Sequence, residues 1–235
     1  MRKGFSLLES LVGIVVFLFI ICGSLEFFGT ARRVFFRLRD REESSQAAWA
    51  AMEKIQTDVR LAGQGLARPM RLGLVSACEQ DDGKWILIRG GSGPLLTADA
   101  APGQTMLMVS ETEESWAGRT VCLFNKTIGE TALVLSSGGG ILELASPLAN
   151  GYRAAETSTV VLQKTTLYLD DAQGVLRRKA DASPAQPLCE DVDAFEFSFD
   201  ASSCLAAVRL AHASAPEKPY VLKTLARNAA LGRRP

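Results

Sequence analysis

A continuous apolar segment near the start of the chain limits the possible folds more than any other feature. It covers residues 5–28, and its only charged residues are Glu9 and Glu26. As a helix, these 24 residues would extend about 36 Å. The hydrocarbon core of a bilayer is about 30 Å thick. We therefore expect one membrane-spanning helix at the N-terminal end of the chain.

The flanking charges suggest an orientation for this helix. Arg2 and Lys3 precede it, so the positive-inside rule places the N-terminus in the cytoplasm and the rest of the chain outside. Five arginines follow the segment: Arg32, Arg33, Arg37, Arg39 and Arg41. They weaken the charge asymmetry, and we expect them to form solvated helix surface. A cleaved secretory signal is disfavoured, because the segment is longer than a signal core and no A-x-A site follows it.

Glu9 does not fit a plain membrane anchor. A carboxylate inside the membrane costs roughly 2–3 kcal/mol on insertion scales. Such a group needs either a partner or a position shallow enough to reach water. An anchor explains the hydrophobicity of the segment and its basic flank, but it gives no reason for the acid.

The stretch MRKGFSLLES, followed by the long apolar segment, resembles the N-terminus of type IV prepilins and of type II secretion pseudopilins. The family pattern is a basic leader that ends in Gly, then Phe, then a Glu four residues later. Here these are Gly4, Phe5 and Glu9. The resemblance implies that a prepilin peptidase cuts between Gly4 and Phe5 and that Phe5 becomes the N-methylated first residue.

Cleavage at that point would give Glu9 a partner. The new α-amino group of Phe5 is positive, and two charges that are each costly in lipid can offset one another when paired. Within one helix, Phe5 and Glu9 are four residues apart, so an internal pair is possible. We favour a pair between subunits, in which Glu9 of an incoming chain meets the Phe5 amine of its neighbour and sets the register of a helical bundle.

The helical pattern continues beyond the apolar segment without a proline. One apolar stripe recurs at steps of three and four: Ala48, Met52, Ile55, Val59 and Ala62. Asp58 is among the polar residues that we place off this stripe. Gly63 and Gly65 supply a stop, so one helix is expected over about 5–62. Its first half is apolar on all sides and its second half is amphipathic.

From residue 71 onward, short β-like runs alternate with turn signals. Strands are expected at 84–89, 105–110, 119–124, 132–135, 140–144, 158–163, 166–169, 175–178, 192–199, 206–211 and 220–226. Residues 170–174 are expected to form a hairpin turn. The expected fold is therefore α+β and pilin-like, with a long helix packed on an antiparallel sheet. The expected divisions are a leader at 1–4, a transmembrane helix at 5–28, its amphipathic continuation at 29–63 and an exported head domain at 64–235.

Short stretches at the end of the expected helix and in the second half of the chain resemble minor pilins of the PilW-like group, and the secretion pseudopilin J group has a similar layout. These stretches are QTDVRLAGQG, LYLDDAQGVLRR, PLCEDVDAFEFSF, AAVRLA and LKTLARN. The resemblance implies a structural subunit that enters a type IV pilus in initiation or at its tip. It implies as partners the prepilin peptidase, other pilins and an inner-membrane assembly platform. The alternatives are a secretion pseudopilin and a single-pass anchored binding domain that forms no filament.

Little in the sequence indicates an enzyme, a cofactor or a metal site. No GxSxG, HExxH or Walker A pattern is present, so we expect no enzyme and no cofactor. The balance of 26 basic and 26 acidic residues gives no reason to expect nucleic acid as a partner. His212 is the single histidine, and we expect it to be a surface or edge residue. No metal site is expected, since no spaced loop of acidic ligands is found.

Four of the five cysteines follow the apolar segment: Cys78, Cys122, Cys189 and Cys204. None of them forms a CxxC pair, which argues against zinc. In an exported domain they could form up to two disulfides, and four cysteines allow three pairings. The pair Cys189 and Cys204, fifteen residues apart, is the preferred one. The run at 206–211 is the expected hairpin partner of 192–199, and this hairpin does not place the two cysteines directly opposite each other, which counts against this pair.

Overall fold

The computed structural model describes residues 7–110, 116–213 and 216–232, with the side chains of Leu8 and Glu9 left aside. Two compact units divide the chain, residues 1–46 and residues 47–235. We call them the N-terminal unit and the C-terminal unit and describe each by itself. The boundary lies within one helix rather than at its end, so residues 47–61 of that helix belong to the unit that also contains the sheets.

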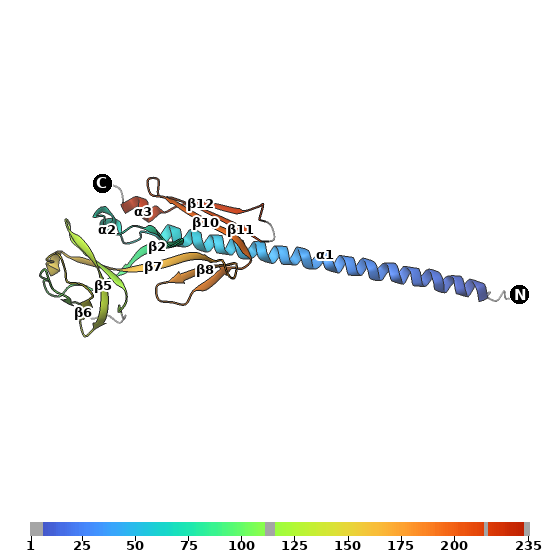
Figure 1. Ribbon diagram of the computed structural model, residues 1–235, viewed down its shortest axis with the longest axis horizontal. Coiled ribbons are helices and arrows are strands. Elements are labelled where there is room, and N and C mark those ends of the chain that lie inside the picture. Colours follow the sequence, from blue (N-terminus) through green and yellow to red (C-terminus); the bar gives the residue numbers. More distant parts are fainter. Residues whose placement is uncertain (1–6, 111–115, 214–215, 233–235) are drawn as a thin grey trace. The chain divides into compact units, whose positions relative to one another are not determined.

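Helix α1 covers Leu7–Leu61 (Figure 1). No proline interrupts this range, and the helix continues through the glycines of the apolar segment. It ends just before Gly63, whose φ of +80° lies in the left-handed region that favours glycine. The amide of Gly63 donates to the carbonyl of Ile88 at 2.7 Å, outside the helix. The predicted helix and its glycine stop are thus confirmed over the described residues.

The C-terminal unit is mainly antiparallel β-structure. Its strands are β1 (Cys78–Asp81), β2 (Lys84–Ser92), β3 (Met106–Met108), β4 (Thr120–Phe124), β5 (Gly129–Gly138), β6 (Ile141–Leu144), β7 (Ser158–Asp170), β8 (Val175–Ala180), β9 (Gln186–Cys189), β10 (Val192–Asp200), β11 (Leu205–His212) and β12 (Tyr220–Leu225). Short helices are α2 (Ala67–Arg71), η1 (Ala154–Glu156) and α3 (Arg227–Gly232). The larger sheet has the order β1-β2-β7-β4-β5-β6-β3, with β8 joining β7 to β9. The smaller sheet has the order β10-β11-β12.

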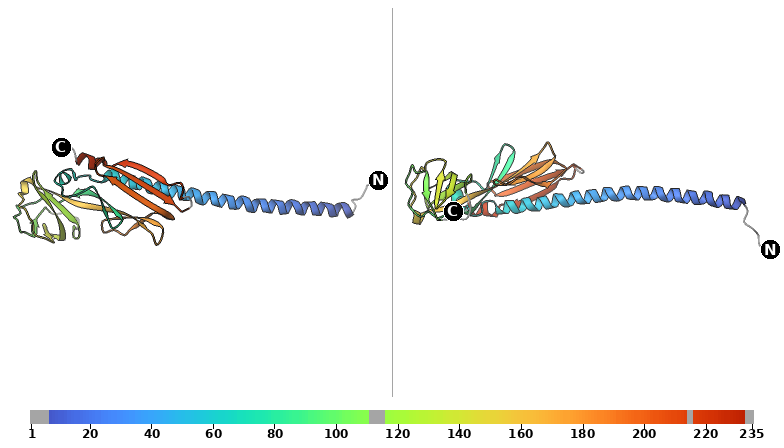
Figure 2. Two further views of the ribbon diagram at one scale, coloured as in Figure 1. Left: turned by 45° about the horizontal axis from the view of Figure 1, so that its top comes forward. Right: turned by 90° about the horizontal axis from the view of Figure 1, so that it is seen from below.

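The last turns of α1 lie against strands of both sheets (Figures 1 and 2). All five residues of the predicted stripe are buried there. They share one hydrophobic cluster with Leu87, Leu167 and Leu176 of the larger sheet and with Val208 and Leu210 of the smaller one. This cluster, which we call the main core, therefore depends on the helix. The architecture is α+β and pilin-like, as predicted.

A second hydrophobic cluster lies toward the other end of the larger sheet. It gathers residues of β3 to β6 with Trp116, Leu148 and Tyr152, and α1 contributes nothing to it among the described residues. Strand β7 is long enough to serve both clusters, since Leu167 belongs to the main core and Val161 to the second.

Most predicted strands are confirmed, with their bounds shifted by a few residues. The hairpin of β7 and β8 and that of β10 and β11 form as expected. Two expectations were wrong in detail: the runs at 158–163 and 166–169 are one strand, β7. The short strands β1 and β9 were missed, because their four-residue sequences (CEQD and QPLC) lack an alternating apolar pattern.

Candidate functional site

The residues predicted for processing and assembly lie at the start of the chain. Gly4 and Phe5 fall outside the described residues, and so does the side chain of Glu9. The backbone of Glu9 lies within α1. The predicted cleavage and the pairing of Glu9 with the Phe5 amine therefore stay predictions.

The described part of the candidate site is the surface of α1 from Leu11 to Leu38. Its apolar side chains are exposed; among them are Leu11, Ile14, Phe17, Phe19, Ile20, Phe27, Phe28 and Phe35. Consecutive positions around the helix are apolar, so no face is polar enough to be the water side. Among the described residues, one helix, α1, is long enough and apolar enough to cross a membrane. An N-terminal signal sequence would meet the same criterion.

Three polar side chains on this surface, Ser24, Arg32 and Arg33, have partners within the helix. The hydroxyl of Ser24 donates to the carbonyl of Ile20 at 2.7 Å, a backbone bond that suits a polar residue in an apolar setting. Arg32 lies over the ring of Phe36 at 5.5 Å, and Arg33 donates to the carbonyl of Gly29. Toward the end of the N-terminal unit, Arg39 and Glu43 form an exposed pair at 2.7 Å. The arginines after the apolar segment are exposed, as expected.

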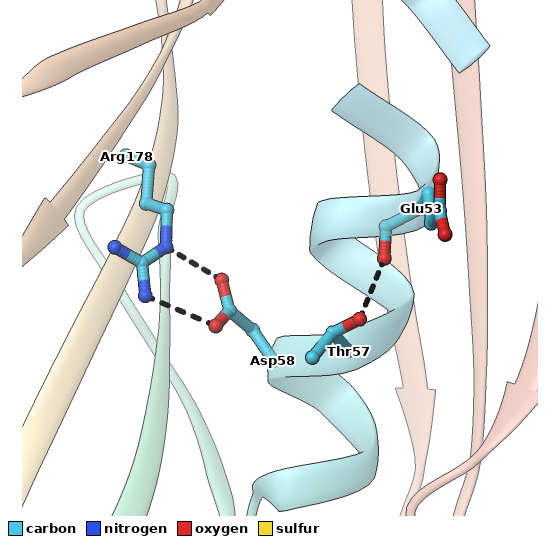
Figure 3. A network of polar contacts seen from close by, with 4 residues as sticks. All are labelled: Glu53, Thr57, Asp58 and Arg178. Atoms are coloured by element: carbon cyan, nitrogen blue, oxygen red, sulfur yellow. Dashed lines mark hydrogen bonds and ion pairs between the residues drawn. The ribbon is translucent and has the colours of Figure 1, made fainter. Parts of the chain in front are cut away.

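In the C-terminal unit, an ion pair joins α1 to the larger sheet. Figure 3 shows Asp58 of α1 facing Arg178 of β8. Nε of Arg178 donates to one carboxylate oxygen of Asp58 at 2.6 Å, and Nη2 donates to the other at 3.0 Å. Both residues are largely buried, with 6% of the Asp58 side chain and 15% of the Arg178 side chain exposed. The hydrogen bond to Asp58 raises the pKa of Arg178 against the opposing effect of burial.

The sequence analysis placed Asp58 on the polar face, and the structure corrects that. Asp58 and Ala62 are four residues apart and thus share a side of the helix, so Asp58 lies at the edge of the buried stripe. The four-residue spacing from Asp58 to Ala62 could have indicated that Asp58 is buried. The partner of Asp58 could not be found from the sequence, because Arg178 is 120 residues away.

All five cysteines are free thiols in this structure. Burial raises the pKa of Cys122 to about 12, and it raises the pKa of Cys189 as well. Neither is therefore an activated nucleophile. His212 is buried at the end of β11, opposite Val192 of β10 and on the central strand of its sheet, rather than at the surface or a sheet edge as predicted.

The preferred disulfide between Cys189 and Cys204 was wrong. Cys189 ends β9, shortly before β10 begins, whereas Cys204 follows the turn at the far end of β10. The nine residues of β10 extend about 26 Å from first to last. A disulfide needs Cα atoms within about 7 Å, so this pair cannot bond without rebuilding the strand.

Comparisons with known proteins add little. No family model and no curated protein matches the chain. One similar solved structure is the tailspike protein gp49 from Pseudomonas phage LKA1, with 18% identity over 31% of this chain and 14% of that chain and a TM-score of 0.29. Another is the Gp54 tailspike of Acinetobacter baumannii bacteriophage AP22, with 14% identity over 33% of this chain and 15% of that chain and a TM-score of 0.29. Similarity this low supports no conclusion about fold or function.

Proposed function

We propose that the protein is a minor pilin, a structural subunit that is processed, drawn from the membrane and built into a type IV pilus. One observation supports this above all. A single helix is apolar and exposed on all sides in its first half, whereas its last turns are buried in an α+β unit. An exposed apolar helix needs lipid or other helices around it, and a filament core of bundled helices supplies the second.

The proposed sequence of events follows from the N-terminal motif. The chain crosses the inner membrane once, with its N-terminus in the cytoplasm and the C-terminal unit in the periplasm. A prepilin peptidase removes residues 1–4, and the exposed Phe5 is methylated. The subunit then leaves the membrane with the help of an assembly platform. In the filament, Glu9 pairs with the Phe5 amine of a neighbouring pilin and sets the register.

The buried pair of Asp58 and Arg178 suits such a role. A subunit that is extracted through its head domain must pass force to its membrane helix. The stripe residues and the bidentate ion pair tie the last turns of α1 to both sheets. Separating them would expose an uncompensated buried charge, which is strongly unfavourable.

Mass spectrometry of the mature N-terminus tests the proposal most directly. Full-length protein is produced together with a prepilin peptidase, purified from membranes and digested. A methylated N-terminal Phe5 is expected. An intact Met1 or Arg2 would reject the pilin class and favour an anchored domain without a filament.

A matched pair of variants then tests the assembly role. Glu9→Ala and Glu26→Ala each remove one of the two carboxylates of the apolar segment. We expect both variants to be inserted and cleaved normally. Incorporation into sheared filaments, measured by immunoblot, should fall to a small fraction of wild type for Glu9→Ala only. Normal incorporation of Glu9→Ala would remove the register role. The motif also occurs in secretion pseudopilins, so neighbouring pilus or secretion genes decide which assembly contains the subunit.

A further inference from the structure

Three buried cysteines belong to the main core. Cys78 is 7% exposed, and Cys189 and Cys204 are each 2% exposed. A single buried cysteine often acts only as a small apolar residue. Three thiols in one core are different, because two that meet there can be oxidised together. Their positions in the strands decide which two can meet.

Cys204 lies at the C-terminal end of α1, on the side of the smaller sheet. It closes the turn between β10 and β11 with a φ of +55°. Its carbonyl accepts a hydrogen bond from the amide of Ala226 at 2.9 Å. Ala226 directly precedes α3, and α3 lies against the end of α1: a Cβ added at Gly63 would be 2.8 Å from the amide nitrogen of Ala229.

Cys78 approaches the same end of α1 from the larger sheet. It is the first residue of β1 and pairs with Leu87 of β2. The next residue of β2, Ile88, donates to the carbonyl of Ala77 at 2.9 Å and accepts from the amide of Gly63 at 2.7 Å. The two cysteines thus reach the residues around Gly63 from opposite sheets. Cys189 is excluded, because it lies near the other end of β10.

The electrostatics of Cys78 agree with this placement. Burial raises the pKa of Cys78 to about 12, and the neighbouring Cys204 thiol adds to the increase. Charge interactions weaken with distance, so an influence of one thiol on the other indicates that the two groups are close. The Cys122 thiol belongs to another hydrophobic cluster, and its pKa is raised by burial alone.

We propose that Cys78 and Cys204 are the disulfide-forming pair of this protein and that their bond joins the two sheets beside the end of α1. One thiolate attacks the disulfide of a thiol–disulfide oxidoreductase and forms a mixed disulfide. The second thiolate then displaces the oxidant as a dithiol, so the protein loses two electrons and two protons and the oxidant gains them. Meeting such an oxidant in the cell rests on the proposed export of the C-terminal unit; the pairing itself does not.

The bond forms while the chain is folding. A thiol with a pKa of about 12 is ionised in roughly one molecule in ten thousand at pH 8. Both sulfurs are also shielded from solvent-borne disulfides once the core has closed. Oxidised glutathione should therefore act quickly on the refolding chain and slowly on the folded, reduced protein.

Peptide mapping of the full chain tests the pairing. The protein is unfolded, refolded in detergent micelles with reduced and oxidised glutathione, alkylated and digested without reduction. Trypsin leaves Cys189 and Cys204 together in peptide 180–209, so a Glu-specific protease that cuts after Glu190 and Glu196 is added. A link between the peptides of Cys78 and Cys204 is expected. A link that uses Cys189 or Cys122, or five free thiols in the refolded protein, would overturn the proposal.

Matched variants connect the link to stability. The oxidised protein should unfold roughly 10–20 °C above the reduced one, since the bond closes a loop of more than 100 residues. That difference should disappear in Cys78→Ala and Cys204→Ala and persist in Cys189→Ala. An equal difference in all three variants would also overturn the pairing. Neither measurement depends on cleavage at Gly4 or on filaments, so a failure here leaves the proposed function untouched.

Discussion

The two parts of α1 show how one helix can meet two different environments. Both parts are rich in apolar residues and neither contains proline. From Leu11 to Leu38 the apolar residues occur all around the helix and are exposed, whereas from Ala48 to Ala62 they form a stripe that both sheets cover. Hydrophobic content alone therefore does not tell where a helix is buried. The periodicity of the apolar residues does tell this. A helix with one apolar stripe packs on one surface, whereas a helix that is apolar on all sides must be surrounded by lipid or other helices.

The ion pairs of the two parts of α1 also differ in their exposure to water. Arg39 and Glu43 are both 60% exposed and lie on one helix, four residues apart. Asp58 and Arg178 come from different elements and are largely shielded from water. Screening by water leaves the first pair weak. The second pair cannot lose either member without leaving a buried charge alone.

The largest contrast is expected from an isoleucine in each part. Ile55 is fully buried in the main core, so Ile55→Ala should lower the free energy of unfolding of the C-terminal unit by about 3–4 kcal/mol. Ile14 is 60% exposed, and Ile14→Ala should leave that unit unchanged. The measurement is thermal unfolding in detergent micelles followed by tryptophan fluorescence. Trp85 is a suitable reporter, because its ring packs against Phe197 at 4.7 Å within the unit.

Equal effects of the two isoleucine variants would contradict the comparison. A loss on Ile14→Ala as large as that on Ile55→Ala would mean that the first part of α1 packs against this chain in solution. A negligible loss on Ile55→Ala would mean that the sheets fold without the helix.

The ion pairs give the next contrast. Arg178→Ala should destabilise the C-terminal unit by about 2–3 kcal/mol, less than for a fully buried pair because Arg178 keeps some contact with water. Arg39→Ala should produce no measurable change in Tm. The same fluorescence assay measures both variants, with far-UV circular dichroism to confirm that each remains folded.

A double variant separates the charge from the packing. Asp58→Leu with Arg178→Met replaces the pair by apolar groups, and it should be less destabilised than Arg178→Ala alone. If the double variant is less stable than Arg178→Ala, the ion pair itself stabilises the fold. The burial of a lone carboxylate is then not the cause of the stability lost in Arg178→Ala.

The sequence analysis predicted the features that local pattern controls. The stripe of Ile55 and its neighbours, the glycine stop and the alternation in β10 each follow from spacing within a few residues. They were found for that reason, and the helix-on-sheet fold follows from them. The strand β7 was divided in two, because the polar residues Lys164 and Thr165 interrupt its apolar runs, although a long strand tolerates such an interruption.

The missed features depend on residues far apart in the chain. Asp58 meets Arg178 only after β8 has been placed beside α1, and four-residue strands such as β1 form because a neighbouring strand offers hydrogen bonds. The cysteine pairing failed for the same reason, since fifteen residues of separation look short until a straight strand lies between them. Glu9 is the opposite case: its prediction comes entirely from the motif, and its side chain lies outside the described residues.

The smallest contrast concerns two glycines, one within α1 and one just after its end. Gly63 stops α1 with a φ of +80°, and an added Cβ would lie 2.8 Å from the backbone of Ala229. Gly63→Ala should therefore destabilise the C-terminal unit by about 2 kcal/mol, through backbone strain and displacement of α3. Gly23 lies in the exposed part of α1 with nothing within 4 Å of its added Cβ. Gly23→Ala should leave the Tm of the unit unchanged and raise local helix stability by up to about 1 kcal/mol.

Hydrogen exchange distinguishes the two glycine effects, because it reports each part of the helix separately. Gly63→Ala should speed exchange of the amides in the last turns of α1 and in α3, where the stop is anchored by the bond from Gly63 to Ile88. Gly23→Ala should slow exchange only near residue 23. A drop in the stability of the C-terminal unit on Gly23→Ala would show that strain in the first part of α1 reaches the sheets, and the two parts of the helix would then have to be treated as one cooperative element.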